Sequence, residues 1–212
     1  MNRLDTVACP MPQTPSPDAR HPAQTQPATE GFALFDTVLG ACGIAWGQSA
    51  LTGVQLPEAD AAVTRARMRW RFSEVREIEP DAAPPSFVQS AIEDITALLR
   101  GDPNAPRDLS NIVLDWTGMA PFNRRVLELA RTIAPGTTMT YGEVATRLGE
   151  PGAARAVGQA LGHNPFAPVV PCHRVLAAGS ASGGFSANGG VSTKLRMLLT
   201  ERAVFGAPGL FD

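Results

Sequence analysis

The sequence predicts an α+β fold built from two units, and three observations support this. Short β-prone runs separated by glycines fill residues 32–56, which is typical of antiparallel strands. Residues 86–101 place apolar side chains at helical spacing. From about residue 118 helical segments dominate, and two short ones joined by a tight turn have the pattern of a helix-turn-helix. We therefore expect an α+β unit over residues 31–117 and a mainly helical unit over residues 118–212.

Residues 1–30 form a distinct segment with six prolines and few large apolar side chains. Such a composition buries too little apolar surface to offset the entropy of ordering, so we expect a disordered tail. The tail lacks the apolar core of a secretory signal, and no run of the chain is long enough to span a membrane. Three cysteines do not suggest a disulfide framework. We expect a cytoplasmic protein with no membrane association.

Within the first unit, the runs GFALFDTVLG, GIAWG and LTGVQL predict a meander of strands. The run EADAAVTRARMRW predicts a first helix, and PPSFVQSAIEDITALLRG predicts a second with one apolar stripe. Ser86 is placed to cap the start of this second helix, and Gly101 is placed to end it. After a loop, NIVLDW predicts a further strand.

The second unit opens with PFNRRVLELARTIAPG, which predicts an amphipathic helix closed by Pro135 and Gly136. TMTYGEVATRLG predicts a short helix with Thr140 as its N-cap, and AARAVGQALG predicts another after the turn EPG. Residues 121–212 carry 9 basic and 5 acidic side chains, whereas residues 1–120 carry 9 basic and 15 acidic ones. The basic half suits a phosphate backbone, although drift in composition explains the asymmetry equally well.

The second short helix is unusual in its outward residues, which are small apart from Arg155. A helix that reads the major groove presents several long polar side chains, so this smooth helix suits the narrower minor groove instead. A single arginine there can fill the stack where a base has left. Tight packing between helices is an equally good reason for small residues, and the pattern alone does not decide between the two.

Cys172 and His173 are adjacent and follow the apolar run APVVP. A thiol reacts as its thiolate, and an imidazole can accept its proton. APVVP predicts a buried strand that ends at a rigid proline and holds the sulfur. In an extended backbone neighbouring side chains point to opposite sides, so we expect a bridging water between the thiol and the imidazole. For an isolated pair a purely structural role remains open.

The segments TYGEVA, AARAVGQALGHNP, VVPCHRV and GGFS…GG…TK…LLTE occur in this order. In combination they resemble the C-terminal domain of the O6-alkylguanine-DNA alkyltransferases, the methylated-DNA–protein-cysteine methyltransferases. The resemblance covers about residues 120–203 and is looser over residues 31–117. It implies an N-terminal ribonuclease H-like small domain and a C-terminal helix-turn-helix (winged-helix-like) catalytic domain.

The resemblance also implies roles for individual residues. Cys172 would accept the alkyl group, with His173 as its base through water and Glu201, on the final helix, orienting the imidazole. Tyr141 would help protonate the guanine as it leaves, and Lys194 would line the base pocket. Tyr141 is the only tyrosine and Lys194 the only lysine of the chain. A lone lysine among arginines favours a site that needs a compact ammonium, although chance and ordinary packing explain both residues too.

For DNA contact, the resemblance implies that Arg155 enters the duplex in place of the flipped guanine. Asn164 would tie the second DNA helix to the segment that bears the cysteine. Further base or DNA contacts would come from Ala154, Val175 through its backbone, Ser186 and Phe185, the last standing where the family often has Tyr.

The implied activity is the irreversible transfer of an alkyl group from guanine O6 to Cys172, once per molecule and without a cofactor. The implied partner is double-stranded DNA containing O6-alkylguanine, bound through the minor groove with the base flipped by a monomeric protein. Cys9, His21 and Cys42 lack the spacing of metal ligands, so we expect no metal.

Three alternatives remain. A non-catalytic lesion-binding relative would place Trp where Cys172 stands. A helix-turn-helix regulator would need a major-groove helix. A cysteine hydrolase would need turnover and would not need Arg155.

Overall fold

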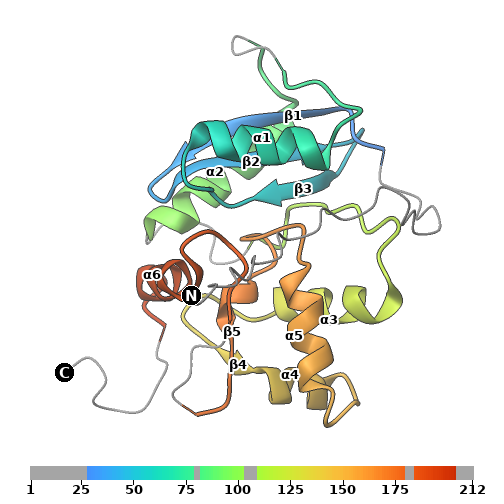
Figure 1. The fold of residues 1–212 in the computed structure, drawn as a ribbon, viewed down its shortest axis with the longest axis vertical. Helices are drawn as coiled ribbons and strands as arrows, with labels where there is room; N and C mark the ends of the chain where they lie inside the picture. The colour runs from blue at the N-terminus through green and yellow to red at the C-terminus, as the bar shows by residue number, and fades with distance from the viewer. Residues whose placement is uncertain (1–27, 79–81, 103–108, 180–183, 204–212) are drawn as a thin grey trace, which may run out of the picture.

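The computed structural model describes residues 28–78, 82–102, 109–179 and 184–203. In these residues a three-stranded sheet with two helices is stacked on a cluster of four helices (Figure 1). We call the first part the sheet region (residues 28–102) and the second the helical region (residues 109–203). The mixed helix and strand fold expected from the sequence is confirmed. Most of the predicted tail, with Cys9 and His21, lies outside the described residues.

The predicted strand meander is confirmed as an antiparallel sheet in the order β1-β2-β3. Its strands are β1 (Gly31–Thr37), β2 (Gly40–Trp46) and β3 (Leu51–Gln55). Side chains alternate between the two faces of a strand. Phe32 accordingly packs with Met68 on one face, while Ala33 and Phe35 join the larger core on the other. Both faces of the sheet are therefore covered.

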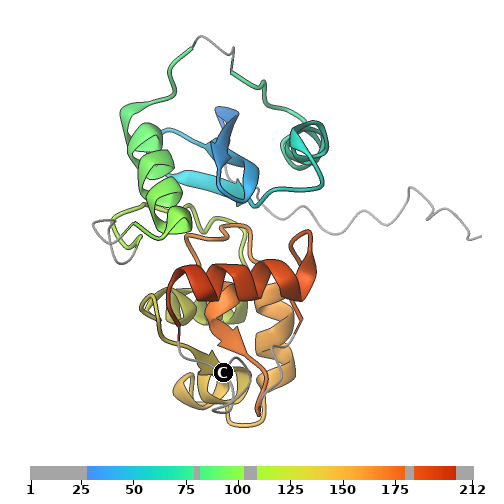
Figure 2. The same ribbon diagram turned by 90° about the vertical axis from the view of Figure 1, so that its left-hand side faces the viewer.

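The two helices of the sheet region lie on opposite faces of the sheet (Figure 2). α1 (Ala61–Arg71) begins at Asp60, whose carboxylate accepts the N–H of Val63 at 2.9 Å. α2 (Ser86–Arg100) ends as predicted at Gly101, with φ 75°. The predicted cap at Ser86 is wrong. Pro85 takes the N-cap position, so Ser86 is already helical and its hydroxyl does not cap the helix.

The strand predicted at NIVLDW, residues 111–116, is also wrong. Only Leu114 in this segment pairs, in a single parallel bridge with Leu51. The guanidinium of Arg131 donates hydrogen bonds to the carbonyls of Leu109, Ser110 and Ile112. Of these acceptors only Ile112 lies in the segment, while the backbone of Val113 and Asp115 bonds to Leu51 in a bridge that does not extend into a strand. The contacts with the distant Arg131 are ones that the local pattern cannot show.

The helical region contains the three helices predicted by periodicity and a fourth near the end of the described residues. They are α3 (Pro121–Arg131), α4 (Tyr141–Arg147), α5 (Ala154–Gly162) and α6 (Gly190–Thr200). Two short parallel strands, β4 (Met139–Thr140) and β5 (Val175–Leu176), join the start of α4 to the segment after Cys172. Within the described residues, no helix combines the length and the apolar character needed to cross a membrane.

The two regions meet at β3. The N–H of Val54 donates to the carbonyl of Pro165 at 2.8 Å, and Val54 forms a parallel bridge with Phe166. Phe166 is buried, and its ring packs edge-on against Trp116 with centroids 5.3 Å apart. The contact therefore joins the sheet to the segment that leads from α5 to Cys172.

The predicted N-cap of α4 is confirmed, and it is a reciprocal capping box. The hydroxyl of Thr140 accepts the N–H of Glu143 at 3.1 Å, and the carboxylate of Glu143 accepts the N–H of Thr140 at 2.6 Å. Both bonds satisfy backbone donors that would otherwise be unpaired at a helix start. The cap fixes the point where β4 turns into α4, and so the position of Tyr141.

We predict that Thr140→Ala lowers the free energy of unfolding by about 1 kcal/mol, the usual cost of losing an N-cap. Urea denaturation followed by circular dichroism measures this. The matched control is Thr146→Ala on the same helix, whose hydroxyl donates to the carbonyl of Gly142 at 2.9 Å. This control should change stability by less than about 0.5 kcal/mol. Equal losses in both variants would contradict the capping account.

Candidate active site

Cys172 begins a 3-10 turn, η1 (Cys172–Arg174), at the end of a series of turns. The buried strand predicted at APVVP, residues 167–171, is therefore wrong, although Val169 and Val170 are buried as expected. Pro168 and Pro171 have no N–H to offer a strand partner. The carbonyl of Val170 accepts instead from the side chain of Asn164 at 2.8 Å and from the N–H of Cys172 at 2.9 Å. Side-chain and local bonds thus replace strand pairing.

The 3-10 turn also changes the reason why the side chains of Cys172 and His173 point in different directions. The extended backbone predicted at Cys172 is absent, and the turn itself separates the side chains. The imidazole of His173 is fully buried and faces Glu201, at the C-terminal end of α6. Cys172 keeps 7% of its surface exposed and lines a cavity on the other side. Cys172 thus borders the cavity, whereas His173 has no exposed surface.

The carboxylate of Glu201 is the centre of a buried network. Its Oε1 lies 2.9 Å from Nε2 of His173, and Arg174 donates to both carboxylate oxygens at 2.7 and 2.8 Å. Arg174 also donates to the carbonyl of Ile133 at 2.5 Å, just beyond α3. Burial acts to raise the pKa of Glu201, but hydrogen bonds and positive charge from His173 and Arg174 outweigh it and lower the pKa to about 2. Glu201 is therefore ionised at neutral pH.

This ionised carboxylate fixes the tautomer of His173. A carboxylate only accepts hydrogen bonds, so Nε2 of the imidazole must carry the proton that it donates to Glu201. Burial lowers the pKa of His173, although Glu201 acts in the opposite direction, so the ring is neutral near pH 7. Its Nδ1 is buried and has no hydrogen-bond partner among the described residues. That nitrogen carries a lone pair that can accept a proton.

The thiol of Cys172 is held by opposing influences. Burial raises its pKa, whereas a hydrogen bond from the side chain of Asn164, the charge of Lys194 and backbone N–H groups lower it. The backbone groups belong to Cys172 and His173, at the start of the 3-10 turn. The resting thiol is therefore neutral, and the groups that lower its pKa would also stabilise a thiolate.

Lys194 and Tyr141 are two further ionisable side chains that interact with Cys172. Lys194 has no exposed surface, and its ammonium donates to the carbonyl of Val175 at 2.7 Å. It also lies 5.8 Å from the centroid of the Tyr141 ring. Burial lowers the pKa of Lys194 to about 8, against the effect of Cys172, and burial together with Cys172 raises the pKa of Tyr141. Lys194 is still mostly charged at neutral pH, and Tyr141 is protonated.

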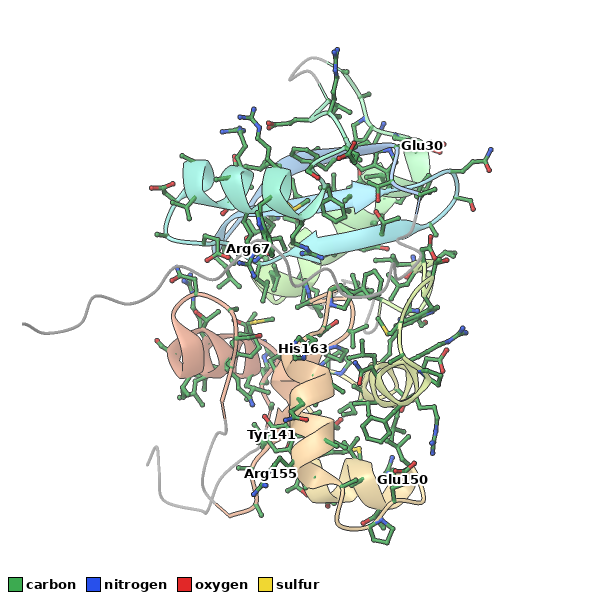
Figure 3. All side chains as sticks on the ribbon, turned by 45° about the vertical axis from the view of Figure 1, so that its right-hand side comes forward. Glu30, Arg67, Tyr141, Glu150, Arg155 and His163 are labelled. Atoms are coloured by element: carbon green, nitrogen blue, oxygen red, sulfur yellow. The ribbon has the colours of Figure 1, made fainter. Side chains whose placement is uncertain are left out.

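A cavity of about 570 Å³ opens beside Cys172. One wall is α5, with Ala154 and Arg155 near its N-terminus, where Figure 3 shows Arg155 close to Tyr141. The facing wall comes from other elements: Tyr141, Cys172, Gly184, Phe185 and Ser186. A space of this size holds a small organic molecule with a few polar contacts.

The structure brings together all the residues singled out from the sequence. Six of them line the cavity: Tyr141, Ala154, Arg155, Cys172, Phe185 and Ser186. The other five belong to residues 170–175 or are hydrogen-bonded to them: Asn164, His173, Val175, Lys194 and Glu201. Cys42 is elsewhere, buried in the sheet region, where burial raises its pKa to about 12.

Arg174 was missed by the sequence reasoning, although it lies within the motif VVPCHRV. It is 3% exposed and makes the bidentate contact that holds Glu201. A signal was present, because an arginine within an otherwise apolar stretch must find an acidic partner when it is buried.

The fold and the site together define an α+β protein with a largely buried cysteine beside a cavity. The cavity that the cysteine lines is walled by a helix bearing an arginine. Comparisons with known proteins identify the chemistry. The family profile "6-O-methylguanine DNA methyltransferase, DNA binding domain" matches residues 121–203.

Curated relatives carry the name methylated-DNA–protein-cysteine methyltransferase. One from Mycolicibacterium paratuberculosis is 43% identical over 171 residues, covering 81% of this chain and 92% of the relative. One from Methanothermobacter thermautotrophicus is 34% identical, covering 75% and 78%. The crystal structure of Mycobacterium tuberculosis OGT in complex with DNA matches with a TM-score of 0.65 and 30% identity, covering 86% of this chain and 99% of that one.

The chain belongs to the methylated-DNA–protein-cysteine methyltransferase family. It is therefore a DNA repair protein that reverses damage directly, by alkyl transfer from DNA to a cysteine.

The lowered pKa of Glu201 should make the free energy of unfolding depend on pH. A carboxyl whose pKa falls on folding, here from 4.5 to about 2, stabilises the fold above pH 4.5, and this contribution is lost as the pH falls toward 2. The wild type should lose roughly 3 kcal/mol more than Glu201→Gln over this range. Urea unfolding at several pH values measures the difference. Glu128→Gln, at an exposed carboxyl paired with Arg124, is the control and should follow the wild type. Parallel curves for all three proteins would contradict the network.

Proposed function

We propose that Cys172 is the residue that accepts the alkyl group, from O6 of a guanine flipped out of double-stranded DNA. One observation carries the proposal. Cys172 lines the same cavity as Tyr141 and Arg155, while the His173–Glu201 pair lies behind it. A base, a nucleophile and a space for the substrate thus converge on one sulfur.

The DNA would be bound through α4 and α5, which we interpret as the helix-turn-helix of a winged-helix-like domain. Arg155 is exposed at the start of α5, and Gly162 is exposed at its end. A narrow helix of small residues can approach the floor of the minor groove closely. Arg155 would then occupy the space in the stack that the extruded guanine leaves, which offsets part of the cost of flipping.

The transfer step would begin with the thiol of Cys172. Its proton passes through a water molecule to Nδ1 of His173, and Glu201 stabilises the imidazolium that forms. The thiolate attacks the alkyl carbon, an S–C bond forms, and the C–O6 bond breaks with its electron pair moving onto the guanine. Tyr141 supplies a proton to the leaving purine. Lys194, whose ammonium lies 5.8 Å from the centroid of the Tyr141 ring, stabilises the tyrosinate that remains until solvent restores the proton.

The product is a thioether at Cys172, and none of the described residues around it is arranged to cleave a C–S bond. Each molecule would therefore act once. The charge of Lys194 and the bond from Asn164 favour the thiolate more than the thiol, so they lower the barrier rather than only binding the substrate. The chemistry requires no cofactor.

The division into an N-terminal ribonuclease H-like domain, residues 31–117, and a catalytic domain, residues 118–212, is part of the proposal. The start of α3 at Pro121, the first helix after the sheet region, supports a boundary close to residue 117. We further propose that the protein acts as a monomer in the cytoplasm.

The direct test is intact-mass analysis after incubation with duplex DNA that contains O6-methylguanine. The protein should gain the mass of one methyl group in place of a hydrogen, located on Cys172 by peptide mapping. Cys172→Ala should remain unmodified, whereas the control Cys42→Ala should be methylated like the wild type. Repeated turnover would indicate a hydrolase, and an unmodified wild type would indicate a lesion-binding protein without transfer activity.

A second prediction concerns Arg155. Arg155→Ala should reduce the rate of transfer from duplex DNA roughly 10- to 100-fold, because flipping costs a few kcal/mol that the arginine offsets. The reaction with O6-benzylguanine as a free base needs no flipping, and its rate should change less than about twofold. Single-turnover kinetics with both substrates measures this. Arg124→Ala, on the exposed side of α3, is the control. An equal loss with both substrates would place Arg155 in the chemical step instead.

A further inference from the structure

We propose that Arg71, on α1 of the sheet region, is a positioning residue for the acceptor thiol. By holding the carbonyl of Pro165, it fixes the neighbouring Asn164 against Cys172. The inference rests on the proposed role of Cys172 as the acceptor, and it assigns the sheet region a part in the reaction.

First, the side chain of Arg71 links the two regions of the protein, and we call this contact the clamp. Arg71 is the last residue of α1, and its guanidinium lies across β3 toward the helical region. It donates to the carbonyl of Val54 at 3.3 Å, to the side-chain oxygen of Gln55 at 3.1 Å and to the carbonyl of Pro165 at 3.3 Å. All three acceptors are neutral, so the guanidinium acts as a geometric link rather than as half of an ion pair.

The crossing depends on a glycine in β3. A Cβ on Gly53 would lie 2.8 Å from Nη2 of Arg71 and 2.7 Å from the ring of Phe72. A Cβ atom does not approach other heavy atoms so closely, so a side chain at this position would require Arg71 or Phe72 to shift. The strand is therefore shaped to let Arg71 reach the helical region.

The second step is the segment that Arg71 holds. The carbonyl of Pro165 accepts from Arg71 and also from the N–H of Val54 at 2.8 Å. The next residue, Phe166, is buried against Trp116. The segment is thus fixed by the sheet region on one side and by an aromatic contact on the other.

The third step leads to the sulfur. Asn164 immediately precedes Pro165, and its side chain accepts from the N–H of Phe166 at 3.0 Å and donates to the carbonyl of Val170 at 2.8 Å. The carbonyl of Val170 also accepts from the N–H of Cys172 at 2.9 Å, and Asn164 and Cys172 line the same pocket as Arg71. The amide of Asn164 lowers the pKa of the Cys172 thiol. A shift at Pro165 therefore moves the amide that faces the sulfur.

Other groups also face the thiol. Lys194 from α6 contributes its positive charge, Tyr141 from α4 lies beside it, and the backbone N–H groups of the 3-10 turn point toward it. None of these contacts Arg71, so its removal should weaken the Asn164 contribution and leave theirs in place. Because that bond lowers the pKa of Cys172, losing it should raise the pKa.

The test compares Arg71→Met with Arg69→Met in the full-length protein. Arg69 is on the same helix, is 66% exposed and pairs only with Glu77 among the contacts of its side chain that the structure records. The reaction of Cys172 with iodoacetamide is followed against pH through the mass of its peptide. Methyl transfer from duplex DNA is measured in a single turnover, and the Kd for undamaged duplex is measured in parallel.

We expect Arg71→Met to raise the pKa of Cys172 and to slow transfer roughly tenfold, the factor for losing one hydrogen bond to a charged group. The Kd should be unchanged, Arg69→Met should match the wild type, and Arg71→Lys should be intermediate. Identical pH profiles for Arg71→Met and Arg69→Met would overturn the inference, as would slower transfer with an unchanged profile.

Two further outcomes are decisive. If Arg71→Met loses its native circular dichroism, Arg71→Lys replaces it: a raised Cys172 pKa supports the clamp, and an unchanged one overturns it. If the wild type takes no methyl group from DNA, the proposed function fails. The iodoacetamide profile still decides the role of Arg71 in that case, because it does not depend on DNA.

Discussion

The carboxylate of Glu201 is the contact on which the site depends. It sits at the end of α6, and its partners His173 and Arg174 belong to the 3-10 turn that begins at Cys172. Arg174 extends the network to the carbonyl of Ile133 at the end of α3. A buried carboxylate is costly unless its oxygens are fully hydrogen-bonded, and here three donors satisfy them. The need to pair this buried charge therefore holds the end of α6, the 3-10 turn and the segment after α3 together beside the sulfur.

A second set of groups, around the sulfur itself, explains how a buried thiol can be neutral at rest and still be able to ionise. Burial raises the pKa of Cys172, so no exposed thiolate is available for oxidation or for stray alkylating agents. The groups that stabilise a thiolate are preorganised around it and need no rearrangement when the proton leaves. If Cys172 accepts one alkyl group per molecule, as we propose, this arrangement would preserve the thiol until a substrate fills the cavity.

Local patterns in the sequence were sufficient for much of the fold. The strands of the sheet, the stripe of α2 and the cap at Thr140 depend on neighbours within a few residues, and the structure has all of them. The strands predicted at residues 111–116 and 167–171 are wrong because these segments depend on residues outside them. In each segment one carbonyl accepts from a side chain outside the segment, that of Ile112 from Arg131 and that of Val170 from Asn164. Periodicity carries no information on such bonds.

The site residues were predicted from sequence motifs of a known family, not from hydrophobic periodicity. Residues within quoted motifs, such as Cys172 and Arg155, could be placed in advance because the resemblance carried their spatial relation. Arg71 belongs to no motif, and its contact with Pro165 spans 94 positions of the chain, so only the fold could show it.

The central claim is that burial keeps His173 neutral, while Glu201 fixes its proton on Nε2 and leaves a lone pair on Nδ1. Nitrogen-15 NMR of the His173 ring in the full-length protein at neutral pH tests this most directly. The account predicts a protonated Nε2 and an unprotonated Nδ1. A proton on Nδ1, or an imidazolium in the resting protein, would contradict it, because Cys172 would then have no base to receive its proton.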